Sequence, residues 1–218
     1  MVSQVTGQQG GGRRRRNRRG EGSRLRDELI EAARRLLAGA EQEADVSIRA
    51  VTREAGAAPQ SFYLQFASLD ELLYAVYTVE YEDLRRAMTR AASGARGPRA
   101  RLAAVCTAYC QYAQEQPGRY RALTGVRGQP RHQEWDGRPL PGAPAFAVLR
   151  DSVAQALTST ESSADPFLAA ATLWAALHGL VTLRASRPAF PWPPLADMIA
   201  TITGQTLSTP AAAARTPQ

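Results

Sequence analysis

The side chains of this 218-residue chain that are best suited to chemistry lie in two short segments. The first is SIRAVTREAGAAPQSFYLQF, residues 47–66, in which Gln60 and Ser61 directly follow a proline. The second is the arginine run RRRRNRR, residues 13–19. Amides, hydroxyls and guanidinium groups form hydrogen bonds with base edges and phosphates, and guanidinium groups also neutralise phosphate charge. Both segments therefore favour binding to nucleic acid.

Catalytic and metal chemistry have no comparable support in the sequence. Neither a glycine-rich phosphate-binding loop nor a nucleophile elbow is present. His132 and His178 are far apart in the sequence. Cys106 and Cys110 are four residues apart on one expected helix, where their Cβ atoms lie too far apart for a disulfide. We interpret both cysteines as reduced core residues, with redox sensing as the alternative, and we expect no enzyme, cofactor or metal site.

The basic charge of the chain is local. The formal net charge is +7, and six of the positive charges belong to the arginine run, so the remainder is nearly neutral. A lipid-surface patch and a solubilising tail are alternatives for this run, but no apolar face lies beside it to hold a membrane. Charged residues follow it where a signal peptide would be apolar, and the run FLAAATLWAALHGLVTL is shorter than the ~20 residues of a spanning helix. We therefore expect a soluble cytoplasmic protein with no membrane partner.

The fold is expected to be all-α, because alanine and leucine are abundant and alternating runs of β-branched residues are absent. The first helix is expected to begin with Ser23 as its N-cap. Its apolar face repeats at helical spacing and consists of Leu25, Leu29, Ala32, Ala33, Leu36 and Leu37.

Two short helices with a sharp corner between them are expected next. Ser47 can cap the first of them, and Gly56 suits the left-handed conformation that closes a helix. Pro59 suits the first turn of the following helix, which is expected to reach Phe66 in two turns. This spacing predicts a helix-turn-helix over residues 47–66, whose second helix is short because it fits a groove.

The remaining chain predicts further helices. A fourth helix begins at Ser68, and an amphipathic helix carries both cysteines on its apolar face. The segment 165–188 is apolar on nearly all sides. One face of that helix can pack on its own domain, and the other requires a second chain.

The residues of the first four helices resemble the N-terminal domain of TetR-type (TetR/AcrR) transcriptional regulators. Farther along the chain, LWAALHGLVTL resembles the Trp/His-Gly helix of one subgroup of TetR-type C-terminal domains. The N-terminal residues that fit the family pattern are Ala32-Ala33, Ser47, Val51, Ala55-Gly56, Ser61-Phe62-Tyr63, Phe66 and Leu72-Leu73.

The resemblance implies that the two short helices bind DNA. It places Arg49 where the second helix reaches a base, and arginine suits a paired hydrogen bond with guanine. It places Tyr63 on a phosphate. The alternatives are a solvated charge for Arg49, packing beside Phe62 for Tyr63, and a purely capping role for Ser47. The DNA-binding residues expected are Ser47, Arg49, Gln60, Ser61, Tyr63, Gln65 and, from the arm, Arg13, Arg14, Arg15, Arg16, Arg18 and Arg19.

Three positions depart from the family pattern. Leu69 replaces the usual lysine at the start of the fourth helix, which removes an expected phosphate contact. Gln65 replaces the usual histidine and can still donate to a phosphate, and Ala58 replaces a small hydroxyl residue. We hypothesise that the arginine arm compensates for the missing attraction, and such arms often enter the minor groove.

The resemblance also implies a C-terminal domain that binds a ligand and forms a homodimer. Trp174 and His178 are four residues apart on the apolar helix and either line a ligand pocket or fill a core. Weaker pocket candidates, for which core packing is the alternative, are Tyr109, Tyr112, Phe146 and Phe167.

The expected function is that of a repressor, released from a palindromic operator by a small hydrophobic effector. A non-specific or architectural nucleic-acid-binding protein that uses the arginine arm is the alternative. The expected parts are a disordered arm over 1–22, a helix-turn-helix domain over 23–68, a ligand-binding and dimerisation domain over 69–206, and a flexible tail over 207–218.

Overall fold

A computed structural model describes residues 21–39, 46–124 and 137–208, and within these residues the chain forms helices and no strand. The all-α prediction is therefore confirmed. The arginine run and the end of the tail lie outside the described residues. The helices are α1 Glu21–Gly39, α2 Ile48–Glu54, α3 Pro59–Phe62, α4 Leu69–Gly94, α5 Pro98–Glu115, α6 Pro117–Thr124, α7 Ala143–Thr158, α8 Pro166–Ser186 and α9 Leu195–Ser208.

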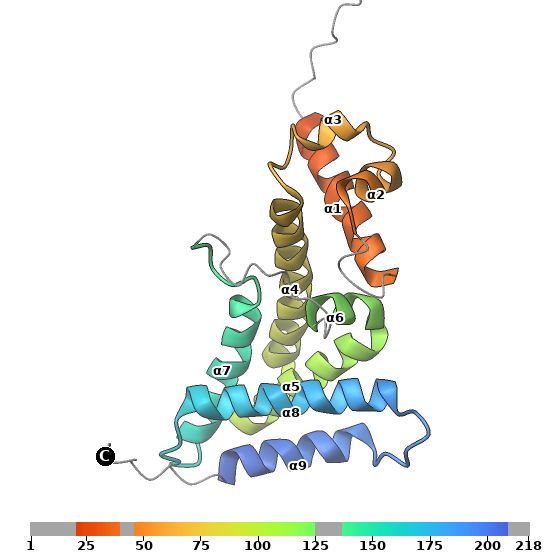
Figure 1. The fold of residues 1–218 in the computed structure, drawn as a ribbon. Helices are drawn as coiled ribbons and strands as arrows, with labels where there is room; N and C mark the ends of the chain where they lie inside the picture. Colours follow the sequence, from red (N-terminus) through yellow and green to blue (C-terminus); the bar gives the residue numbers. More distant parts are fainter. Residues whose placement is uncertain (1–20, 40–45, 125–136, 209–218) are drawn as a thin grey trace, which may run out of the picture.

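The molecule is elongated, with a small head at one end and a larger body at the other (Figure 1). Helices α1, α2 and α3 form the head. The long helix α4 leads from the head into the body, where it packs on α5 and α7. Helices α8 and α9 lie side by side across the end of the body that is farthest from the head.

The corner between α2 and α3 is built from local hydrogen bonds. The Ser47 hydroxyl oxygen accepts from the Ala50 backbone N–H at 3.2 Å, which confirms the expected cap. Gly56 has a φ of 64°, and the Ala57 N–H donates to the Thr52 carbonyl at 2.8 Å. This pattern is the Schellman closure that glycine permits without strain. Pro59 occupies the first turn of α3, as expected.

Two of the expected helix boundaries were wrong. Helix α1 begins at Glu21, so Ser23 lies inside its first turn and does not cap it. Helix α3 ends at Phe62, and the chain reaches Phe66 through hydrogen-bonded turns in place of a second helical turn. The Phe66 N–H still donates to the Phe62 carbonyl at 3.0 Å, so the turns remain compact.

One continuous core runs through head and body. The predicted inner faces are buried in α1 at Leu29, Ala32, Ala33 and Leu37, whereas Leu25 and Leu36 are partly buried. Helix α5 buries the apolar face that carries both cysteines, from Leu102 to Ala113. Hydrophobic burial along this path holds α4 and α5 together and sets the position of the head on the body.

Helix α8 is longer than the apolar run suggested. It spans 21 residues, which is enough by length and composition to cross a membrane. One such helix is weak evidence for a membrane protein, because core helices pass the same test. Leu173 and Leu177 are fully buried in the body, but only 28% of the most apolar stretch of α8 is buried, so packing on the core accounts for one face of the helix. Leu168 and Leu183 remain exposed on another face.

Candidate DNA-binding site and effector site

The segment after Pro59 presents polar side chains at the tip of the head. Gln60 is exposed and Ser61 is half-buried. Tyr63 has 63% of its surface exposed, and the edge of its ring meets the Phe62 ring at a centroid distance of 5.4 Å. Phe62 itself is fully buried. The buried aromatic ring anchors the segment, and the neighbouring donors point away from the core.

Helix α2 carries two of the other predicted contacts. Arg49 is exposed and forms no ion pair with any residue that the structure describes, whereas Arg35 of α1 pairs with Glu54 at 2.8 Å. Ser47 is exposed, and the cap uses its hydroxyl only as a hydrogen-bond acceptor. Because a hydroxyl can accept and donate at once, Ser47 can cap α2 and donate to a phosphate.

The end of the segment is fastened to α1 by a residue that sequence reasoning missed. Arg26 Nη1 donates to the Gln65 carbonyl at 3.2 Å, and its guanidinium group lies 4.3 Å from the centroid of the Phe66 ring. Gln65 is half-buried. Leu64 was also not among the predicted site residues; it follows Tyr63 and has 71% of its surface exposed. No local spacing pattern links Arg26 to a residue 39 positions away.

The start of α4 explains one departure from the family pattern. Leu69 is half-buried and packs against the hydrophobic core, so it stabilises the fold at the position where the usual lysine would contact DNA. Ser68 Oγ accepts from the Glu71 N–H at 3.2 Å, and Glu71 Oε2 accepts from the Ala67 N–H at 2.7 Å. The Ser68 and Glu71 side chains thus cap the N-terminus of α4 reciprocally, as in a capping box.

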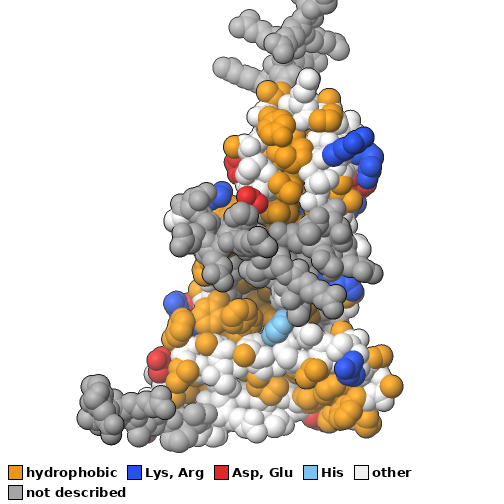
Figure 2. All heavy atoms as spheres, in the orientation of Figure 1, with side chains coloured by type: hydrophobic (Ala, Val, Ile, Leu, Met, Phe, Trp, Pro, Cys, Tyr) orange, Lys and Arg blue, Asp and Glu red, His pale blue; other side chains and the backbone are white. Residues whose placement is uncertain are grey.

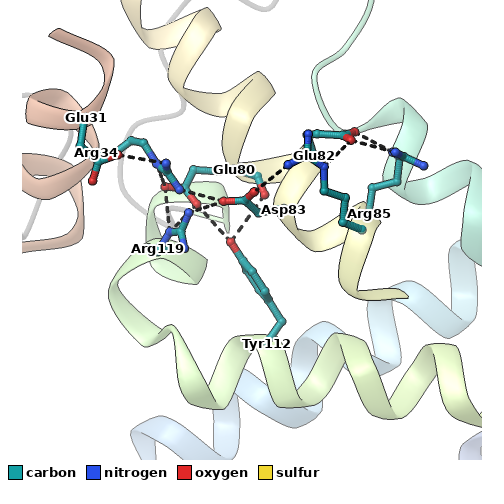
Figure 3. A network of polar contacts seen from close by, with 9 residues as sticks. Glu31, Arg34, Glu80, Glu82, Asp83, Arg85, Tyr112 and Arg119 are labelled. Carbon is teal, nitrogen blue, oxygen red and sulfur yellow. Dashed lines mark hydrogen bonds and ion pairs between the residues drawn. The ribbon is translucent and has the colours of Figure 1, made fainter. Parts of the chain in front are cut away.

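A buried ionic cluster joins the head to the body (Figure 3). The Glu80 carboxylate of α4, whose side chain is 2% exposed, accepts from Arg34 of α1 at 2.7 Å and from Arg119 of α6 at 2.8 Å. Asp83, one turn farther along α4, also pairs with both arginines. The Tyr112 hydroxyl of α5 donates to Glu80 at 3.1 Å. Four helices therefore meet at one carboxylate.

The electrostatics of this ionic cluster reflect opposing effects. Burial raises the pKa of the Glu80 carboxyl, and the hydrogen bonds from Arg34 and Tyr112 act in the other direction. Burial also raises the pKa of the Tyr112 hydroxyl, and the neighbouring negative charges add to that shift. Tyr112, a predicted pocket residue, thus directs its hydroxyl to the ionic cluster.

Helix α6 approaches α1 very closely beside the ionic cluster. A Cβ atom on Gly118 would lie 2.6 Å from the Ala38 carbonyl oxygen, which is closer than packed atoms come. Arg121 Nη2 donates to the same carbonyl at 3.3 Å. Only glycine allows this approach, so the α1–α6 contact depends on Gly118.

A second polar group lies inside the body, among aromatic rings. The Tyr109 and Tyr120 hydroxyls are 2.7 Å apart, and the Tyr120 hydroxyl is 2.8 Å from His178 Nδ1. Burial raises the pKa of Tyr109 to about 12 and lowers the pKa of the half-buried His178. We call Tyr109, Tyr120 and His178 the hydroxyl–histidine chain.

Aromatic rings flank the hydroxyl–histidine chain. The Phe146 ring of α7 lies 5.6 Å from Phe167 and 5.9 Å from Trp174. Trp174 also interacts with Tyr109. Figure 2 shows a group of hydrophobic side chains beside a histidine on this face of the body. Apart from Tyr112, the predicted pocket residues therefore lie together, and Tyr120 is the member that sequence reasoning missed.

The cysteines are packed within the body. Cys106 and Cys110 are free and fully buried, as their spacing predicted. Burial raises the pKa of each thiol to about 12, so little reactive thiolate forms near neutral pH. Among the described residues, no group of three or more His, Cys, Asp or Glu side chains could hold a metal ion.

Comparison with known proteins identifies the family. Residues 102–206 match the family model for a tetracyclin repressor-like C-terminal domain. The chain therefore carries a C-terminal domain of the TetR-type family. This match lies mainly in the body, whereas the sequence resemblance rested chiefly on the head. The Trp/His-Gly subgroup is not distinguished by the match and stays a prediction.

Solved structures with the same fold include other TetR-type proteins. A protein of unknown function from Rhodococcus sp. RHA1 is 23% identical, with a TM-score of 0.67 and coverage of 84% of this chain and 93% of that chain. A putative TetR family regulator from Shewanella sp. PV-4 is 16% identical, with a TM-score of 0.67 and coverage of 84% and 96%. The Bacillus subtilis regulator FadR, solved with stearoyl-CoA, is 14% identical, with a TM-score of 0.66 and coverage of 84% and 97%. At these identities the likeness concerns the fold.

Proposed function

We propose that this TetR-type regulator is a cytoplasmic repressor that binds a palindromic operator as a homodimer and is released by a small hydrophobic effector. The observation that carries the proposal is the exposed set of donors at the tip of the head, with Phe62 and Phe66 buried behind it. Such a segment can enter a major groove without disturbing its own core. Arg49, Gln60, Ser61 and Tyr63 would contact DNA.

The homodimer would form through the outer faces of α8 and α9. Leu168 and Leu183 are exposed at the two ends of the α8 face, with the small residues Ala175 and Gly179 between them. A second copy of the chain would cover these apolar side chains and allow close helix packing. The homodimer must hold its two copies of the segment after Pro59 about 34 Å apart to reach successive major grooves.

Effector release would act through α6. Adjacent residues of this helix face two sites, since Arg119 joins the ionic cluster and Tyr120 joins the hydroxyl–histidine chain. An effector that shifts Tyr120 would also shift Arg119 and, through Arg34, the head. The effector can do this only if it binds the displaced state more tightly than the DNA-bound state. The stearoyl-CoA seen in the Bacillus FadR structure supports a hydrophobic effector.

A competition experiment tests the operator proposal. An operator selected from random duplexes should be preferred over its shuffled sequence by about 10³-fold or more. A similar affinity for both sequences would contradict the repressor and favour the architectural alternative, in which the arginine arm supplies the binding.

Arg49→Ala should weaken operator binding by roughly 1–3 kcal/mol and relax specificity at one base position, because a paired hydrogen bond to a base would be removed. Affinities for all single-base operator variants would be measured by fluorescence anisotropy. Arg90→Ala removes an exposed arginine near the C-terminal end of α4 and is the matched control. An equal loss on every sequence would show that Arg49 does not read a base.

Deleting residues 1–20 should flatten the salt dependence of operator binding. The slope of log affinity against log salt concentration should fall by about 0.9 for each phosphate that the arm neutralises in the full-length protein. Deleting residues 1–12 removes no arginine and should leave the slope unchanged. If both deletions behave alike, the arginine arm does not bind phosphates.

A further inference from the structure

A donor and an acceptor can be assigned to each hydrogen bond of the hydroxyl–histidine chain. Tyr109 is 4% exposed, and among the described residues its hydroxyl has no acceptor other than Tyr120. If His178 Nδ1 donated to Tyr120, three protons would share two contacts, and the buried hydroxyl proton of either Tyr109 or Tyr120 would have no acceptor. A buried donor without a partner is strongly unfavourable, because it loses its hydrogen bond to water and gains none in the protein. The opposite direction gives an acceptor to the hydroxyl protons of both tyrosines.

In that direction Tyr109 donates to Tyr120, and Tyr120 donates to Nδ1 of His178. The neutral imidazole must then carry its hydrogen on Nε2. The Nε2–H has no partner among the residues that the structure describes, and His178 is half-buried rather than open to water on all sides.

The surroundings of this donor limit what it can bind. Trp174 and Phe146 stack edge to face beside it, and Phe167 extends the aromatic surface. Neither the hydroxyl–histidine chain nor these rings carry a carboxylate that could pair with a cation. An apolar molecule with a hydrogen-bond acceptor would fit both the rings and the N–H.

We propose that the effector is an aromatic or aliphatic molecule with a carbonyl or carboxylate oxygen that accepts the Nε2–H hydrogen bond of His178. This proposal names the ligand class for the effector site and rests on the proposed function. Uncharged hydrocarbons of the same shape would bind more weakly, because they leave the imidazole donor without an acceptor.

The test uses two probes of nearly the same shape, acetylnaphthalene and isopropenylnaphthalene, substituted at the same ring position. They differ in that a carbonyl oxygen replaces a methylene group. Dissociation constants would be measured by titration calorimetry with the full chain and without DNA. One added hydrogen bond should make the ketone bind about 3–10-fold more tightly.

Two variants assign that preference to His178. His178→Phe removes the donor and should bring the two affinities to within about twofold, which is smaller than the contribution of one hydrogen bond. His178→Gln supplies an amide N–H near Nε2 and should keep most of the preference, provided that circular dichroism shows native helix content. Equal affinities in the unchanged protein, no binding of either probe, or a preference that survives in His178→Phe would overturn the proposal.

The outcome can be separated from that of the operator proposal, because no DNA is present in the titration. A protein that shows the ketone preference but no operator specificity would contradict the repressor and leave the ligand class supported. A protein that binds its operator specifically but lacks the ketone preference would contradict the ligand class and leave the repressor supported.

Discussion

Glu80→Ala is expected to lower the free energy of unfolding by about 3–5 kcal/mol, the usual cost of breaking a buried ion pair by removing one partner. Arg34 and Arg119 would keep only Asp83 as their shared partner, and the Tyr112 hydroxyl would lose its carboxylate acceptor and keep only the backbone carbonyl of residue 80, at 3.5 Å. The measurement is urea-induced unfolding followed by circular dichroism, at one fixed protein concentration because a dimer's stability depends on concentration.

Glu82→Ala is the matched control. Glu82 lies two residues away on the same helix and also contacts two arginines, Arg85 at 2.6 Å and Arg86 at 2.9 Å. These pairs lie at the surface, where water and salt weaken them, so the midpoint should change little. If both variants lowered the stability equally, burial of the ionic cluster would not be what makes Glu80 important.

Ala175→Arg is expected to convert the proposed homodimer to a monomer and to weaken operator binding by roughly 10²–10⁴-fold. Ala175 is exposed on the outer face of α8, so an arginine there would put a large charged side chain at the centre of the proposed interface. The loss of affinity follows because a monomer binds one half-site and forfeits the effective concentration of the second head. Analytical ultracentrifugation would give the oligomeric state, and anisotropy would give the affinity.

Ala100→Arg introduces the same side chain at an exposed alanine near the start of α5 and should leave both properties unchanged. A dimeric Ala175→Arg protein would show that α8 does not form the interface. A monomeric protein with unchanged operator affinity would show that pairing of the heads is not required for binding.

Local features of the head were predictable from the sequence, because each depends on residues within one or two turns. The Ser47 cap, the left-handed Gly56 and the position of Pro59 all follow from hydrogen bonds between near neighbours. The inner face of α5 followed from helical periodicity in the same way. The end of α3 was missed, because a short helix has too few periodic positions to mark its last residue.

The connections between helices were not predictable in this way. Arg34 meets Glu80 across 46 residues and Tyr120 meets His178 across 58 residues, and no spacing rule reaches that far. Tyr112 shows the consequence: the pocket and the core were the two roles expected of it, but its hydroxyl faces the ionic cluster because α4 brings Glu80 to it. Side-chain type and helical phase can thus be read along the chain. Which polar group a buried hydroxyl or carboxylate meets depends on how the packed helices cross, since burial obliges each such group to find a partner wherever the fold supplies one.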